Sequence, residues 1–162
     1  MMPVITAATI TAQACAPFGD LVAAAGTFRV INQGRCRRFH DLARLDVVDG
    51  WVGINLFQAD MRAAPYLIEM MERHPLGSQC FIPMQGADYL VVVAHDDQGR
   101  PGEISAFLVD GMQGVNYHRN IWHAVLTPIS GSGLFAVIDR IGEGANLEEH
   151  WFDTPIGISI EA

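Results

Sequence analysis

The chain contains no lysine, because all ten of its basic residues are arginine. This absence excludes a Schiff-base mechanism and a lysine general base. It also leaves arginine as the side chain that would bind an anionic ligand, a task that suits its planar fork of donors. Charged residues make up only 17% of the chain, and the net charge is −8. Such an acidic protein is a poor match for nucleic acid or for an anionic membrane surface.

Cysteine is scarce as well. Cys15, Cys36 and Cys80 are odd in number and lack CxxC spacing, so neither a disulfide framework nor a zinc ribbon is indicated. No apolar run approaches the roughly 20 residues that a membrane-spanning helix needs. No basic residue precedes Arg29, so we expect no signal peptide at the start of the sequence. These features predict a soluble protein of the reducing cytoplasm.

Half of the residues are apolar, and 162 residues are enough for one domain with a substantial core. We therefore expect a single domain over residues 1–162. Short apolar runs recur between turn compositions such as Gln33-Gly34 and Asp110-Gly111, which is typical of a sandwich, a barrel or a jelly roll. The predicted strands are Phe28–Asn32, Trp51–Phe57, Gln79–Met84, Tyr89–His95, Ile104–Val109, Val125–Pro128, Leu134–Asp139 and Ile156–Ile160.

One segment has a different pattern. In Ala63–Arg73, Pro65 stands near the start, and Leu67, Met70 and Met71 follow at three- and four-residue spacing. This pattern predicts a short helix that covers an edge of the barrel. A second helical turn is expected within Gln13–Ala24. The expected fold is therefore all-β with one or two short helices.

Polar, titratable residues gather around the predicted strand Gln79–Met84. Glu72 and His74 come just before it, and Gln79 opens it. If Glu72 and His74 are extended, both side chains point to the same face. They could be satisfied polar residues at the junction of two elements, but burying several unpaired polar groups costs several kcal/mol. Together they favour a functional site.

A second polar cluster spans Tyr117–His123. His118 and His123 are candidates for acid–base chemistry near neutral pH. Because neighbouring residues of a strand face opposite ways, His118 and Arg119 point inward together only if the backbone turns between them. For His123, which follows Trp122 on an apolar strand, a role in the core is an equally good interpretation. For Arg140, an ion pair with the preceding Asp139 is the alternative.

The spacing of these residues resembles the first cupin motif, with His74 and Gly86 at matching positions. Glu72 and Gln79 stand where the motif has a histidine and a glutamate, and His123 resembles the histidine of the second motif. The resemblance implies a cupin-like double-stranded β-helix, or jelly-roll barrel. It also implies a metal site made of Glu72, His74, Gln79 and His123. An amide oxygen is a poor transition-metal ligand, so we expect this site to be weak or absent.

Longer strings are similar to the ureidoglycolate lyase family. They are residues 72–84 (Glu-Arg-His-Pro-Leu-Gly-Ser-Gln-Cys-Phe-Ile-Pro-Met), residues 114–123 and Ile138-Asp139-Arg140. Residues 16–20 and 39–42 fit the beginning of the family pattern, so the resemblance covers nearly the whole chain. It implies a cupin-like homodimer that splits ureidoglycolate into glyoxylate and urea during allantoin (purine) degradation. It also implies an association with nickel, although no ion is expected to be tightly bound.

The resemblance suggests roles for the polar residues. Elimination of urea needs a base for the substrate hydroxyl, an acid for the departing nitrogen and a cation for the carboxylate. Glu72 and His123 are the expected proton-transfer pair. Gln79 would bind the ureido group. The remaining candidates are His118 as a further catalytic group, His74 and Tyr117 as substrate contacts, and Arg119 or Arg140 on the carboxylate.

Three alternatives stay open at this stage. The chain could be a cupin-type oxygenase or isomerase with a tightly bound iron or manganese. It could be a non-catalytic sensor barrel for a small carboxylic acid. It could also hydrolyse the ureido group to ammonia and carbon dioxide, although no dinuclear metal site is evident for that reaction.

Overall fold

The computed structural model of the protein describes residues 1–161, and almost all of the regular structure is β. The single helix, α1 (Ala12–Cys15), has Thr11 as its N-cap, whose hydroxyl oxygen accepts a hydrogen bond from the Ala14 N–H. The strands are β1 (Val4–Thr9), β2 (Gly19–Val22), β3 (Arg29–Ile31), β4 (Cys36–Arg38), β5 (Trp51–Ala59), β6 (Tyr66–Arg73), β7 (Gln79–Pro83), β8 (Tyr89–Asp97), β9 (Arg100–Val109), β10 (Gly114–Tyr117), β11 (Trp122–Ala124), β12 (Thr127–Pro128), β13 (Gly133–Ile141) and β14 (Glu148–Ile160).

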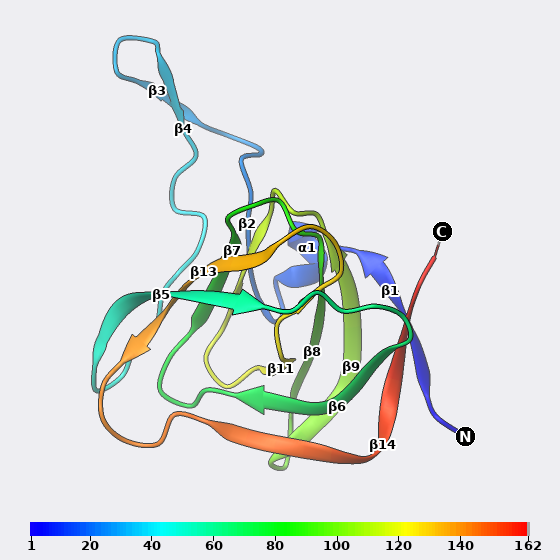
Figure 1. Cartoon of the computed structure of the whole chain (residues 1–162). Coiled ribbons are helices and arrows are strands. Elements are labelled where there is room, and N and C mark those ends of the chain that lie inside the picture. The colour runs from blue at the N-terminus through cyan, green and yellow to red at the C-terminus, as the bar shows by residue number, and fades with distance from the viewer. Residues whose placement is uncertain (162) are drawn as a thin grey trace.

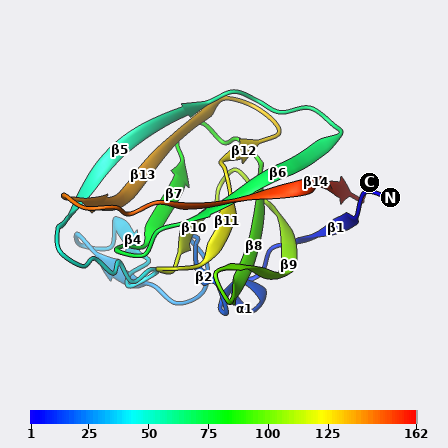
Figure 2. The same cartoon turned by 90° about the horizontal axis from the view of Figure 1, so that it is seen from below.

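Six strands close into a mixed barrel in the order β11-β6-β14-β1-β9-β8, because β11 also pairs with β8. β1 is parallel to both of its neighbours, and Figures 1 and 2 show it beside β14. The barrel is filled by apolar side chains that include Met71, Val92 and Trp122. Each fully buried side chain of this size contributes about 1.5–3 kcal/mol through the hydrophobic effect.

A five-stranded sheet, β2-β10-β7-β13-β5, packs against one wall of the barrel. Between them lies a second core that includes Phe81, Phe135 and Val137. β8 serves both cores, since Val92 points into the barrel and Val91 and Val93 point toward the five-stranded sheet. This explains why β8 is continuously apolar rather than alternating.

The all-β, cupin-like barrel expected from the sequence is confirmed. The predicted helix Ala63–Arg73 is wrong, because Tyr66–Arg73 forms β6 between β14 and β11. The register of β14 against β6 shifts between Trp151 and Ile156. Ile68 and Met71 face the barrel core, whereas Leu67, part of the apolar spacing that predicted the helix, is exposed. The second predicted helical segment is only the four residues of α1, which ends shortly before Pro17.

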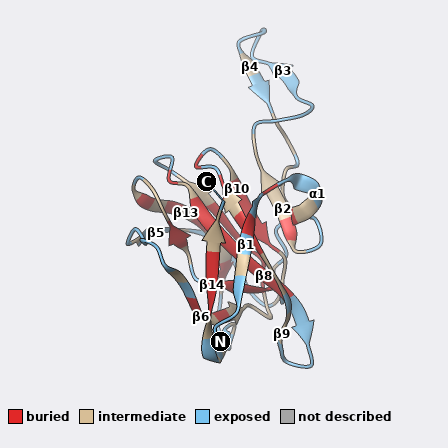
Figure 3. Cartoon of the chain, turned by 90° about the vertical axis from the view of Figure 1, so that its right-hand side faces the viewer, coloured by how far each residue is buried: buried red, intermediate tan, exposed pale blue. Residues whose placement is uncertain are grey.

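The β3–β4 hairpin, with β3 and β4 paired only to each other, forms a separate two-stranded sheet. It projects from the body of the molecule in Figure 1, and both of its strands are coloured as almost wholly exposed in Figure 3. The short strands β1, β2, β4, β10 and β11 were not predicted. Among residues 1–161, no helix has the length and apolar character needed to cross a membrane.

Candidate active site

Two rows of side chains face each other between the barrel and the five-stranded sheet. In the five-stranded sheet, Gln79 lies directly opposite both Tyr117 and Asp139. In the barrel wall, Glu72 lies directly opposite His123. Residues directly opposite each other on neighbouring strands share a face. The rows meet where the Tyr117 ring stacks on the His123 ring, with a centroid distance of 4.3 Å and an interplanar angle of 1°.

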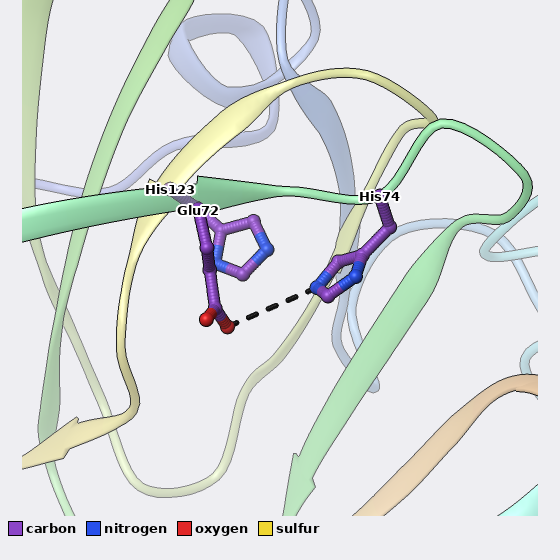
Figure 4. Close-up of side chains that lie close together, drawn as sticks. All are labelled: Glu72, His74 and His123. Atoms are coloured by element: carbon purple, nitrogen blue, oxygen red, sulfur yellow. Dashed lines mark ion pairs between the residues drawn. The ribbon is translucent and has the colours of Figure 1, made fainter. Parts of the chain in front are cut away.

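We call Glu72, His74, Gln79, Tyr117 and His123 the inter-sheet cluster. Figure 4 shows that Glu72 and His74 reach the same spot as His123 from different elements. One ligand atom from each of these three residues lies within 4.8 Å of the other two. The ring centroids of His74 and His123 are 5.2 Å apart. The expectation that extended backbone brings Glu72 and His74 to one face is therefore met.

Both histidines of the cluster have a defined tautomer when neutral. His123 Nδ1 lies 3.0 Å from the Ala124 carbonyl oxygen, and His74 Nδ1 lies 2.8 Å from that of Asn146. A carbonyl only accepts, so each Nδ1 carries the proton and each Nε2 presents a lone pair. Both Nε2 atoms are buried without a hydrogen-bond partner among the described residues. Each is oriented to accept a proton or to bind a metal ion.

Burial shifts the pKa values of His123 and Glu72. It lowers the pKa of His123 to about 3, with the neighbouring His74 as a second cause, so His123 is neutral near pH 7. Burial raises the pKa of Glu72, and Glu149 on β14 raises it further, while His74 acts in the opposite direction. The Glu72 side chain is 20% exposed, and its carboxylate lies 3.8 Å from His74 Nε2. A carboxyl group with a raised pKa is suited to exchange protons with a substrate near neutral pH.

The orientation of Gln79 is fixed by Asp139. Asp139 accepts hydrogen bonds from Gln79 Nε2 at 3.1 Å and from Asn55 Nδ2 at 2.9 Å. An ionised carboxylate only accepts, so the amide nitrogen of Gln79 must face Asp139. Its carbonyl oxygen Oε1 is then free and buried, with no partner in the described structure. Gln79 is therefore oriented to accept a hydrogen bond from an N–H group.

Asp139 is a residue that the sequence reasoning missed. An ion pair with Arg140 was the alternative, but adjacent residues of β13 point to opposite faces. Arg140 instead donates to the backbone carbonyls of Val48, Asp49 and Glu143. The structure thus does not bring Arg140 into the inter-sheet cluster, because its guanidinium holds a loop. Asn55 was also missed, and nothing in its sequence context distinguishes it.

His118 and Arg119 are likewise outside the cluster. His118 follows Tyr117 with its side chain on the other face of the sheet, where its Nε2 lies 3.2 Å from an Asp20 oxygen. Arg119 Nε lies 3.5 Å from an Asp46 oxygen. The two side chains line a surface hollow of about 460 Å³ together with Arg44, Asp46, Ser78 and Asn120. The strand alternation considered in the sequence is thus the reason that His118 lies apart from His123.

Three side chains of the inter-sheet cluster have donor atoms that suit a metal ion. Glu72, His74 and His123 offer a carboxylate and two imidazoles whose Nε2 atoms are unpartnered, which suits a divalent transition metal. The backbone carbonyls that hold both Nδ1 atoms act as the outer contacts that orient metal-binding histidines. Gln79 fits less readily, because its amide oxygen is a poor ligand for a transition metal. The residues therefore fit a divalent ion through three side chains.

The chain is similar to known proteins over almost its whole length. The family model described as ureidoglycolate lyase matches residues 2–159. The chain belongs to the ureidoglycolate lyase family. A ureidoglycolate lyase of Rhodobacter capsulatus is 52% identical over 149 residues, which is 91% of this chain and 92% of the relative. One of Rhizobium etli (strain CIAT 652) is 47% identical and covers 92% of each chain. One of Chelativorans sp. is 45% identical and covers 96% of each chain. Family membership thus extends over the strands that carry the inter-sheet cluster.

Proposed function

We propose that this member of the ureidoglycolate lyase family cleaves ureidoglycolate into glyoxylate and urea, a step of allantoin (purine) degradation. The observation that carries the proposal is the set of unpartnered polar atoms beside Glu72. They are the Nε2 atoms of His74 and His123 and the Oε1 atom of Gln79. Leaving such atoms buried without partners is costly, so a polar ligand is the natural occupant of this space.

The reaction is an elimination that breaks one carbon–nitrogen bond. The hydroxyl oxygen of the substrate loses its proton and forms a carbonyl group, while the bonding pair of the carbon–nitrogen bond goes to the ureido nitrogen. That nitrogen takes up a proton, so the proton count of substrate and products balances. Glu72 accepts the hydroxyl proton and, because of its raised pKa, returns it to the nitrogen. Where no ion is bound, His123 Nε2 accepts a hydrogen bond from the hydroxyl and orients it toward Glu72.

Gln79 and Tyr117 position the substrate. The free carbonyl oxygen of Gln79 accepts from a ureido N–H, because Asp139 occupies the amide nitrogen. The Tyr117 ring holds the imidazole of His123 by stacking. Burial raises the pKa of Tyr117 far above the neutral range, so this ring carries no charge. Both contacts hold reacting groups in place before the reaction.

Glu72, His74 and His123 would hold a divalent ion, and nickel is the ion that the family resemblance implies. A bound ion would supply Lewis acidity to an oxygen of the substrate. We propose that this ion is weakly held, since the fourth expected ligand, Gln79, offers only an amide oxygen, which is a poor ligand for a transition metal. We further propose that residues 1–162 form one domain, that the protein is a homodimer and that it acts in the cytoplasm, where three free cysteines stay reduced.

Product analysis of the purified protein tests the proposal. With racemic ureidoglycolate, we expect urea and glyoxylate in equal amounts and no ammonia. Glu72→Gln should lower kcat by about 100-fold or more, because an amide cannot carry the proton. Glu69→Gln, on an exposed residue of the same strand, is the matched control and should retain wild-type kcat. Ammonia in place of urea, or binding without turnover, would contradict the lyase assignment.

A further inference from the structure

The β3–β4 hairpin lacks a core of its own. Its two strands pair only with each other, and Phe28, Val30 and Ile31 expose their apolar side chains. A two-stranded hairpin is marginally stable in water unless it packs against another surface. Within residues 1–161 no third strand joins it, and it projects from the body of its own chain (Figure 1). Its apolar residues are therefore suited to contact another molecule.

Two arginines of this hairpin stand in an unfavourable position. Arg29 lies directly opposite Arg38, so the two side chains share a face. Like charges in such a pair destabilise a hairpin. No carboxylate of the described chain lies within 4.0 Å of either guanidinium. Arg37 differs, because it lies over the Phe28 ring at 5.1 Å. The Arg29–Arg38 pair therefore needs an anionic partner from elsewhere.

The inter-sheet cluster, in contrast, lacks a cation from the described residues. Glu72 and Asp139 belong to its two facing rows, and Glu149 lies opposite Glu72. The arginine nearest to Glu72 in sequence, Arg73, already pairs with Asp96 and Glu148 at 2.7 and 2.6 Å. As described above, Arg119 and Arg140 are engaged outside the cluster. The substrate that we propose carries a carboxylate, yet these described arginines supply no cation for it.

Beside the inter-sheet cluster, strand β5 forms an exposed edge that could pack against another chain. β5 is the edge strand of the five-stranded sheet, and its Asn55 bonds to Asp139 beside Gln79. Trp51 and Phe57 lie on the same face of this strand as Asn55, and both side chains are exposed. A long apolar edge strand is a template for association unless something covers it. The β3–β4 hairpin also has an exposed apolar surface, which could pack against this edge.

We propose that a second copy of this chain covers that rim and that its β3–β4 hairpin places Arg29 and Arg38 at the inter-sheet cluster, where they bind the substrate carboxylate. Charge complementarity selects this occupant. The hairpin segment, residues 27–40, holds four of the ten arginines and no acidic residue, while the whole chain carries a net charge of −8. Two guanidinium groups side by side match a carboxylate well. The inference rests on the proposed lyase function and adds that each active site is shared between two copies.

The test compares the double variant Arg29→Ala/Arg38→Ala with the control Arg100→Ala. Arg100 is exposed and is the first residue of β9. We expect the hairpin variant to lose about 10- to 100-fold in kcat/KM for ureidoglycolate, the worth of a charge-assisted contact. The Arg100→Ala control should have the same kcat/KM for ureidoglycolate as the wild type. Analytical ultracentrifugation of each protein should show a dimer for the wild type and for Arg100→Ala.

Mixed dimers separate a shared site from a self-contained one. When the hairpin variant is co-expressed with Glu72→Gln in equal amounts, half of the dimers are mixed, and each mixed dimer has one site with an intact cluster and an intact hairpin. Activity should return to about a quarter of the wild-type kcat/KM. Activity that stays at the level of the two parents, or a wild type that is monomeric, would overturn the proposal. An absence of urea from the wild type would instead remove the lyase function itself.

Discussion

Asp139 offers a direct test of how the site is oriented. It accepts from the amide groups of both Gln79 and Asn55. In Asp139→Asn, the new side chain can accept from one of them, but its own amide nitrogen then faces the other. One of the two amides must rotate or lose its bond. If Gln79 rotates, its nitrogen replaces its carbonyl oxygen at the inter-sheet cluster, and the acceptor for the ureido N–H is lost.

The size of the effect follows from these contacts. A hydrogen bond to a charged group contributes about 1.5–3 kcal/mol, and the half-buried position of Asp139 argues for the lower end. We expect Asp139→Asn to lower the free energy of unfolding by about 1–2 kcal/mol. Loss of one ureido contact should raise KM for ureidoglycolate by about 10-fold, with a smaller change in kcat.

Steady-state kinetics on folded variants measure this effect, with urea denaturation as the stability assay. Asn55→Ala is the matched control, since it removes the other amide and leaves the Gln79–Asp139 bond in place. The control should keep KM within about threefold of the wild type. A folded Asp139→Asn protein whose KM equals that of the wild type would refute the orienting role of Asp139.

Three further outcomes follow from the structure. Burial lowers the pKa of His123 to about 3, whereas in the unfolded chain it titrates near 6.5. The contribution of His123 to stability is therefore full above about pH 6.5 and falls between pH 6.5 and 3, by a total on the order of 5 kcal/mol. The raised pKa of Glu72 opposes part of this loss, and His123→Phe should flatten the pH dependence of unfolding. Arg140→Ala leaves three backbone carbonyls without their hydrogen-bond donor, so it should lower the unfolding free energy by about 2–4 kcal/mol in denaturation curves. KM for ureidoglycolate should change much less. Dialysis against a chelator should leave the thermal midpoint nearly unchanged if the ion is weakly held, and a large drop would show a tightly bound metal.

The sequence predicts the architecture well where strands keep a simple pattern. β5, β7, β8 and β13 are close to their predicted ranges because each is bounded by turn residues, whereas β9 begins at Arg100 and not at the predicted Ile104. The spacing of Leu67, Met70 and Met71 predicts a helix, but β6 pairs with β14, whose shift in register changes which β6 residues face the core. Such a change arises from pairing between residues about 80 positions apart along the chain, and local patterns do not contain it.

Some residues of the candidate site could be predicted from the sequence, and others could not. Glu72, His74, Gln79 and His123 were found because their residue types and spacing suit chemistry. The placement of His118 depends on strand alternation, which the sequence suggested but did not decide. Asp139 and Asn55 owe their role to neighbouring strands, because their partner Gln79 comes from β7. A contact that exists only after β5, β13 and β7 pair has no signature in a single sequence.

A crystal structure of Glu72→Gln with ureidoglycolate bound tests the central claim most directly. The account predicts the ureido group against Gln79 and the hydroxyl against His123, inside the inter-sheet cluster. Substrate bound instead in the surface hollow beside His118 and Arg119, with the inter-sheet cluster empty, would contradict it.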